Sequence, residues 1–374
     1  MQSKNIGYIE KLDHIRFLAA FAVIEFHSDI WMRSIGAPRE PLPLPLFHQG
    51  YVGVALFMVI SGFILTAITY DKQIETWRFY LNRILRIYPL LIFVVTLGYF
   101  VTPDPREAST GVDYLLALLP ISNLYRLHYG AYGGVLFSVA IELQFYLLFP
   151  ALAYFLRRYG IRHYVEVIMA LIALRGVVFA LQGTVHHLAY FSIFGALDIF
   201  LIGALAWIVY IKTPMRRYSG WTVLAVFVGI NIVIWAAHAH RSFFHFDFDG
   251  VTSDGTSRSA LWIVWPTLEG LMFAALVLVY LRSGFSMPFA GVFAYLGKIS
   301  YSLYVWHTII FLGLVRSHLN FLPAFEMGLF VVLPLAVLIS HFSYRLIERP
   351  FLEMRVRYVA PASETQVPPS KVIA

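Results

Sequence analysis

One pair of ionisable residues lies in the first apolar stretch of the chain. His27 follows Arg16 by eleven positions, and eleven residues make about three turns of α-helix, so both side chains share one face about 16 Å apart. Ionisable groups inside a membrane-spanning helix are costly and therefore indicate function. A packing histidine bonded to a carbonyl is the simpler alternative. A general base that deprotonates a hydroxyl fits better, because imidazole titrates near neutral pH.

A carboxylate and a second histidine lie in later apolar stretches. Glu142 falls in SVAIELQFYLLFP, just inside the membrane, where a carboxylate needs a partner or a proton. It could orient His27 or pair with an arginine, and a structural ion pair is as good an interpretation as a catalytic role. His307 lies mid-span in SYSLYVWHTII, with Tyr304 one turn earlier. Taken alone, His307 fits a satisfied core histidine better than a ligand.

Two arginines mark the beginning of the third apolar stretch. Arg83 and Arg86 stand three positions apart in FYLNRILRIYP, so both guanidinium groups lie on one helix face, a geometry suited to several phosphate oxygens. The alternative is a pair of arginines that anchors the helix at the membrane surface. Pro89 slightly favours the phosphate site, because a proline kink opens space between helices.

Signals for a metal site are weak. The chain has no cysteine, and no helical stretch carries a His-x3-His or Glu-x2-His pair, so we expect no metal cofactor. Arg175, Asp198 and Glu269 also fall within apolar stretches. We expect these three to form a structural set of paired charges.

The elements that position these residues are membrane helices. Of 374 residues, 59% are hydrophobic and 13% charged, with a mean hydropathy of +0.72, whereas a soluble domain has about a quarter of its residues charged. The net charge of +7 is scattered over several loops, which fits membrane orientation better than nucleic-acid binding. We therefore predict an all-α fold, a polytopic transmembrane helix bundle.

We predict ten membrane spans and one shorter helix. The stretches of spanning length are 12–33, 51–70, 84–102, 135–156, 164–182, 188–210, 220–239, 260–281, 292–315 and 326–347. Segment 113–127 is short and broken by Pro120, so we expect a re-entrant or interfacial helix, with an eleventh span as the alternative. Ten spans put most lysines and arginines on one side, which predicts both termini in the cytoplasm. Residues 1–352 would form one membrane domain and 353–374 a short disordered tail.

Six blocks of the sequence resemble, in order, blocks of the membrane acyltransferase-3 family. They are LDHIRFLAAFAVIEFH, VGVALFMVISGFILT, FYLNRILRIYPLL, FSVAIELQFYLLFPAL, LGKISYSLYVWH and LIERPF. One block alone would be weak evidence for the family, but six blocks in the expected order are strong evidence. The first block differs from the family's usual Asp-Gly-Leu-Arg because His14 replaces the glycine, and Phe137 stands where a tryptophan or its equivalent precedes Ser138. Neither change removes a proposed catalytic group.

The resemblance implies an O-acyltransferase of the bacterial inner membrane that moves an acyl group, usually acetyl, from coenzyme A to a sugar hydroxyl. The family's arginine-ten-residues-histidine motif corresponds to Arg16 and His27, and its Arg-x2-Arg motif to Arg83 and Arg86. The other matched positions are Glu142, Tyr304, His307, and Ser61 of the SGF motif. Some relatives carry an appended esterase-like domain; these 374 residues do not, so we expect the membrane unit or a separate protein to complete the transfer.

These matches predict a division of roles. Four residues are expected to be catalytic: His27, Glu142, His307 and Tyr304. Four are expected to bind the donor acetyl-CoA: Arg16, Arg83, Arg86 and Ser61. His27 would deprotonate an acceptor hydroxyl for direct attack, or would itself be acetylated first. The expected partners are a glycan or lipid-linked saccharide and membrane lipid, with no nucleic acid. The alternative function is an exporter or flippase of a lipid-linked saccharide.

Overall fold

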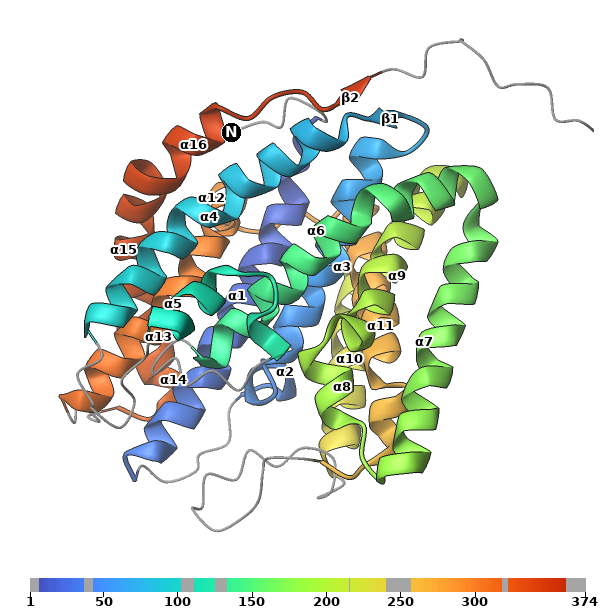
Figure 1. Ribbon diagram of the computed structural model, residues 1–374. Helices are drawn as coiled ribbons and strands as arrows, with labels where there is room; N and C mark the ends of the chain where they lie inside the picture. Colours follow the sequence, from blue (N-terminus) through green and yellow to red (C-terminus); the bar gives the residue numbers. More distant parts are fainter. Residues whose placement is uncertain are drawn as a thin grey trace, which may run out of the picture.

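Helices form nearly all of the described part of the chain in the computed structural model (Figure 1). The structure describes residues 7–36, 43–101, 111–124, 133–214, 216–239, 257–317 and 322–360. The longer helices are α1 (Glu10–Ser34), α3 (Val52–Thr69), α4 (Thr76–Val101), α6 (Gly133–Tyr159), α7 (Ile161–Gln182), α9 (Ile193–Lys212), α10 (Gly220–Ala239), α11 (Trp265–Leu281), α13 (Ser300–Arg316) and α15 (Leu333–Ser343).

Shorter elements connect these helices. The short α-helices are α2 (Pro45–His48), α5 (Gly111–Leu118), α8 (His186–Phe191), α12 (Ala290–Lys298), α14 (Ala324–Met327) and α16 (Arg349–Glu353). Two 3-10 turns, η1 (Ser122–Leu124) and η3 (Ala260–Ile263), and two π-helical segments, η4 (Gly328–Val332) and η5 (Tyr344–Glu348), complete the helical elements of the described ranges. The strands are β1 (Gln73–Ile74) and β2 (Val359–Ala360).

The bundle is apolar on its outside as well as in its core. Seven helical segments within the described ranges are long and apolar enough to cross a membrane. In α3 78% of the spanning window is buried, whereas in α7 and α10 only 22% is, and these two rim helices expose Leu181 and Trp221. Apolar side chains facing outward are what a lipid environment requires. The predicted all-α membrane bundle is confirmed at this level.

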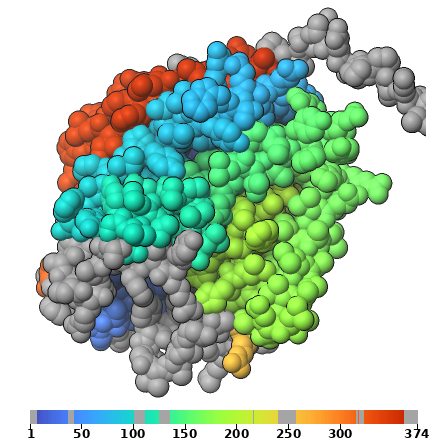
Figure 2. Space-filling model, in the orientation of Figure 1, coloured from blue at the N-terminus to red at the C-terminus, as the bar shows by residue number. Residues whose placement is uncertain are grey.

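Helices α1 and α3 lie at the centre of the bundle. Figure 2 shows α4, α5, α6 and α7 covering one face, so that most of α1 and α3 is hidden behind them. Helix α3 packs closely on α9 because both have glycine at the contact: a Cβ on Gly62 would lie 2.0 Å from the Phe200 carbonyl oxygen, and one on Gly203 would lie 2.2 Å from that of Val59. The close contact at Gly62 fixes the neighbouring Ser61 on the side of α3 that faces α6.

Three predicted spans are interrupted. The stretch 188–210 breaks at Ser192 between α8 and α9, 260–281 breaks at Val264 between η3 and α11, and 292–315 breaks at Ile299 between α12 and α13. The stretch 326–347 lies within one continuous helical segment, Ala324–Glu353, which includes π-helical turns. Within 113–127, α5 and η1 are too short to cross a membrane, and residues 125–127 lie outside the described residues. The short helix predicted for this segment is therefore present.

The two described ends of the chain lie at the same end of the bundle, which we call the terminal end (Figure 1). Here β2 pairs antiparallel with β1, Gln73 opposite Ala360 and Ile74 opposite Val359. This pairing differs from the disorder expected for residues 353–374, because residues 354–360 pack on α4; residues 361–374 lie outside the described residues. We call residues 354–360 the C-terminal strap.

Candidate active site

Two histidines from different helices face each other inside the bundle. Nδ1 of His27 on α1 lies 3.2 Å from Nε2 of His307 on α13, and the ring centroids are 5.0 Å apart. His307 is fully buried and His27 is half-buried. The two residues are 280 positions apart in the sequence. The sequence motifs predicted each histidine separately, and the packing of α13 against α1 brings the two together.

The hydrogen bonds assign the tautomers of both rings. Nδ1 of His307 lies 3.3 Å from the Leu303 carbonyl; because a carbonyl only accepts, this nitrogen carries a proton and Nε2 offers a lone pair. Nδ1 of His27 lies 2.9 Å from the Val23 carbonyl, so it too is protonated and can also donate to His307. In the neutral ring, His27 Nε2 is then the basic nitrogen, and no bond from the described residues occupies it.

A pair of hydroxyl groups lies beside His307. The Tyr304 hydroxyl is 2.7 Å from the Ser138 hydroxyl, and the two lie 3.1 Å and 3.0 Å from the Val135 carbonyl oxygen. The rings of Tyr304 and His307 are 5.8 Å apart. Both hydroxyls line a cavity, so one of their two protons can turn toward an oxygen bound there while the other keeps the pair in place.

Glu142 lies away from the histidines. Its Oε1 accepts hydrogen bonds from Ser61, at 3.1 Å, and from Tyr146, and Arg86 is close enough for electrostatic attraction. No hydrogen bond joins Glu142 to His27 among the described residues. Of the two partners predicted for Glu142, the structure therefore favours an arginine over His27, because α6 presents the carboxylate to α3 and α4.

Arg83 is held by aromatic rings, not by a carboxylate. The carbon of its guanidinium lies 5.4, 5.2 and 5.8 Å from the ring centroids of Phe79, Tyr146 and Tyr358. Its Nε is buried and has no hydrogen-bond partner within the described ranges. Stacking of this kind holds the planar cation while leaving its donors available. Arg83 could therefore donate hydrogen bonds to an anionic ligand.

Two adjoining cavities connect the arginines to the hydroxyl pair. The first, of about 100 Å³, is lined by Arg83, Arg86 and Glu142 and also by Ser138 and Tyr304. The second, of about 160 Å³, is lined by residues of the terminal end of the bundle, among them Tyr8, Lys298 and Arg355. The residues that line both cavities are Arg16, Ile64, Arg83 and Arg86. The arrangement suits an elongated ligand with an anionic end at the arginines and a reactive end near the histidines.

The chain is also similar to known proteins. The family model of the acyltransferase-3 family, described as an acyltransferase domain, matches residues 9–341. The chain belongs to the acyltransferase-3 family. This membership confirms the resemblance that the six sequence blocks carry.

Relatives of this acyltransferase-3 chain occur in Staphylococcus aureus. A protein of strain COL, provisionally named an O-acetyltransferase, is 24% identical over 378 residues, which cover 93% of this chain and 58% of the relative. The O-acetyltransferase OatA of strain NCTC 8325 is 25% identical over 388 residues, covering 92% of this chain and 57% of OatA. The chain thus spans less than two thirds of the length of these relatives. No solved structure matches it.

Within the acyltransferase-3 unit, the residues predicted from sequence fall into three places. Tyr304 lines the first cavity together with Glu142 and Ser61, and the His27–His307 pair lies next to Tyr304 outside the lining of this cavity. The cations Arg16, Arg83 and Arg86 lie where the two cavities join, and Arg16 also pairs with Asp13 at 3.3 Å.

Sequence reasoning missed three residues near the arginines. Tyr146 follows Glu142 by four positions on α6, so helical spacing could have found this partner. Arg355 and Tyr358 of the C-terminal strap reach the arginines only through tertiary packing. No local pattern in the sequence marks them.

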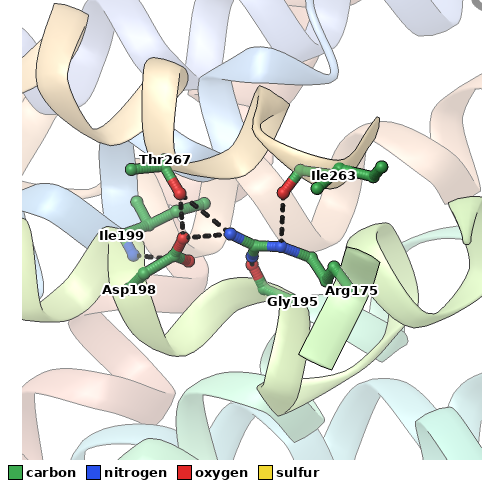
Figure 3. A network of polar contacts seen from close by, with 6 residues as sticks. All are labelled: Arg175, Gly195, Asp198, Ile199, Ile263 and Thr267. Carbon is green, nitrogen blue, oxygen red and sulfur yellow. Dashed lines mark hydrogen bonds and ion pairs between the residues drawn. The ribbon is translucent and has the colours of Figure 1, made fainter. Parts of the chain in front are cut away.

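The charges of α7 and α9 form a separate structural network (Figure 3). Arg175 donates to the Asp198 carboxylate at 2.7 Å, to the Thr267 hydroxyl at 2.8 Å, and to the carbonyls of Ile263 at 2.8 Å and Gly195 at 3.1 Å. The structural pairing predicted for Arg175 and Asp198 is therefore present. Glu269 is close enough to Asp198 for electrostatic repulsion, but its hydrogen-bond partner is Trp265, and no ion pair joins it to Arg175 among the described residues.

Of two further buried acids, Glu348 lies close enough to Arg86 for electrostatic attraction, whereas Glu25 lies apart from the site. Glu25, two positions before His27 in the chain, faces η4, where a Cβ on Gly328 would lie 2.5 Å from its Oε2. Within the described residues, no group of three His, Asp or Glu side chains gathers as a metal ion would require. The groups that this site offers are imidazole, hydroxyl, carboxylate and guanidinium groups.

Proposed function

We propose that this chain is a membrane O-acetyltransferase that moves an acetyl group from acetyl-CoA to a hydroxyl of a glycan or lipid-linked saccharide. The observation that supports the proposal is the first cavity, which is lined by Arg83 and Arg86 and by the Ser138–Tyr304 hydroxyl pair, with the Tyr304 ring 5.8 Å from that of His307 in the His27–His307 pair. Hydroxyl acceptors agree with the O-acetyltransferase names of the relatives. The proposed location is a bacterial inner membrane, with both termini in the cytoplasm.

The arginine end suits the donor. Coenzyme A carries several negative charges at its nucleotide end, and Arg83 has a buried Nε that lacks a partner among the described residues. A bound phosphate would satisfy it with a charge-assisted hydrogen bond. The extended pantetheine arm spans roughly 15 to 20 Å, comparable with the rise of about 16 Å between Arg16 and His27 on one helix face. Donor phosphates at the arginines would then place the thioester near the histidines.

The reaction needs one proton acceptor and one oxyanion donor. His27 Nε2 takes the proton of the acceptor hydroxyl as its oxygen forms a bond to the thioester carbonyl carbon. The carbon–sulfur bond then breaks, and the CoA thiolate leaves with the proton that His27 returns. A hydroxyl of the Tyr304–Ser138 pair donates to the carbonyl oxygen while it carries negative charge. In the alternative order, His27 is acetylated first, which gives ping-pong kinetics.

The test uses the purified full chain in lipid nanodiscs with acetyl-CoA labelled on its acetyl group. We expect label to appear as an ester on added glycan acceptors, in step with release of free CoA. An exporter or flippase would leave the label on the thioester. Label that stays on acetyl-CoA with every glycan and lipid-linked saccharide tried would contradict the proposal.

A further inference from the structure

The C-terminal strap is tied to the beginning of α4 by backbone contacts. Asn82 holds Val356 on both sides: its Nδ2 donates to the Val356 carbonyl at 2.6 Å, and its Oδ1 accepts from the Val356 amide at 2.9 Å. The Glu75 amide donates to the Tyr358 carbonyl at 2.9 Å, and β2 pairs with β1. The strap is therefore part of the folded unit and keeps a fixed register along α4.

This register places one strap residue against Arg83. Tyr358 is fully buried, with its ring 5.4 Å from that of Phe79 and 5.8 Å from the Arg83 guanidinium. It thus supplies one of the three rings that hold Arg83. A segment outside the membrane-spanning helices thereby helps to build the arginine-lined region that the two cavities share.

The same register places the Arg355 side chain in the lining of the second cavity. Arg355 lines it together with Arg16, Arg83, Arg86 and Lys298, and the only acid among the described residues of that lining is Asp13, which pairs with Arg16. Burial, followed by repulsion from Arg86 and Arg83, lowers the pKa of Arg355 to about 10. The next basic residue of the strap, Arg357, is exposed instead. The lining of the second cavity thus carries a net positive charge, because it contains more lysines and arginines than carboxylates.

The order of the cations follows the order of anionic groups along coenzyme A. Arg83 and Arg86 line both cavities, whereas Arg355 and Lys298 line only the one at the terminal end. In the donor, the diphosphate follows the pantetheine arm, and the 3′-phosphate of the ribose lies farther from the thioester. A diphosphate at Arg83 and Arg86 therefore leaves the 3′-phosphate on the side of Arg355.

We propose that the C-terminal strap completes the donor site and that Arg355 binds the 3′-phosphate of the acyl-CoA. This inference rests on the proposed function, because it takes a CoA thioester as the donor. It assigns a binding residue outside the helix bundle and outside the matched residues 9–341. Selection for the phosphorylated form of the donor would then depend on the strap.

The experiment measures binding and turnover of two donors, acetyl-CoA and acetyl-3′-dephospho-CoA, by the full chain in nanodiscs. For the wild type we expect acetyl-CoA to bind about tenfold or more tightly, as a charge-assisted phosphate contact implies. Arg355→Gln should lose that preference: its KM for acetyl-CoA should rise about tenfold, while its KM for the dephospho donor and its kcat for both should stay unchanged. Arg355→Lys should recover part of the preference.

Arg357→Gln is the matched control, since it removes the same charge from an exposed position of the same strap. It should keep the wild-type preference. Equal donor preference in Arg355→Gln and wild type would overturn the inference but leave the proposed function intact. Equal weakening of both donors would also overturn it, since Arg355 would then not distinguish the 3′-phosphate. A wild-type protein that binds neither donor would instead contradict the proposed function.

Discussion

Two hydrogen-bond acceptors lie next to Nδ1 of His27 and hold a proton on this nitrogen. The Val23 carbonyl and the His307 Nε2 lone pair both lie next to Nδ1, so the basic lone pair of the neutral ring is at Nε2. A base needs its lone pair directed at the substrate and its proton held elsewhere. In the proposed mechanism, His307 would act on the reaction through the orientation of His27, as a positioning residue.

His307→Phe keeps the ring volume but removes the acceptor next to His27. The Val23 carbonyl remains, so we expect the tautomer to persist while the ring loses its fixed orientation. The expected result is a fall in kcat of about 10²-fold with KM for acetyl-CoA unchanged, measured by steady-state kinetics over a range of donor concentrations. His163→Phe, at a partly exposed surface position of α7, is the control. An unchanged kcat in His307→Phe would show that the pair has no role in turnover.

The arginines are expected to act in the opposite way, on binding and not on turnover. Arg83→Gln or Arg86→Gln should each raise KM for acetyl-CoA by about 10- to 100-fold, the value of a charge-assisted contact, with kcat at saturation nearly unchanged. Arg78→Gln is the control on the same helix, because Arg78 is half-exposed and pairs with Glu75. A donor affinity that does not change in either variant would refute the assignment of these residues.

The positions of the helices could be predicted from the sequence, but the places where these helices are interrupted could not. All ten apolar stretches overlap helices, because hydropathy and length are local properties. The break at Ile299 and the two π-helical segments have no comparable local signal. The C-terminal strap was expected to be disordered because its composition is polar; only its pairing with β1 and Asn82 orders it. The family motifs supplied the site residues but not the contacts of Glu142.

The contact between α3 and α9 depends on glycine. Gly62→Ala would put a methyl group 2.0 Å from the Phe200 carbonyl oxygen, so the two helices must separate. We expect a loss of about 1–3 kcal/mol of stability and lower activity, since Ser61 moves with the helix. Gly176→Ala on α7 meets nothing within 4 Å and should be neutral or slightly stabilising. The measurement is thermal unfolding followed by tryptophan fluorescence; equal melting temperatures for the two variants would contradict this packing.

The Arg175 network joins α7, α9 and α11, so its loss should also reduce stability. Asp198→Ala leaves Arg175 buried without its counter-charge, and we expect a cost of about 3–5 kcal/mol. Arg175→Met combined with Asp198→Leu should recover much of this loss, because no unpaired charge remains. Glu166→Gln, which breaks an exposed pair with Arg162, should cost far less, as exposed pairs generally do. A single Asp198→Ala variant as stable as wild type in thermal unfolding would show that the network contributes nothing.

Over the whole molecule, the proposed function separates the cations that would bind the donor from the groups that would react. The terminal end carries Arg355 and Lys298, the arginines of α4 lie between the two cavities, and the His27–His307 pair lies next to Tyr304 of the first cavity. With the terminal end in the cytoplasm, as the charge distribution predicts, donor and acceptor would approach the histidines from opposite sides. The reactive acetyl group could then reach the acceptor without the nucleotide crossing the membrane.

The most direct measurement is transfer of labelled acetyl from acetyl-CoA to glycan hydroxyls by purified wild type and His27→Gln. The account predicts ester formation by the wild type and a loss of at least about 10²- to 10⁴-fold in His27→Gln, the contribution of a general base. The variant should still bind acetyl-CoA with wild-type affinity and unfold at the same temperature, because the arginine end of the cavity is unchanged. Transfer by His27→Gln at the wild-type rate would contradict the account.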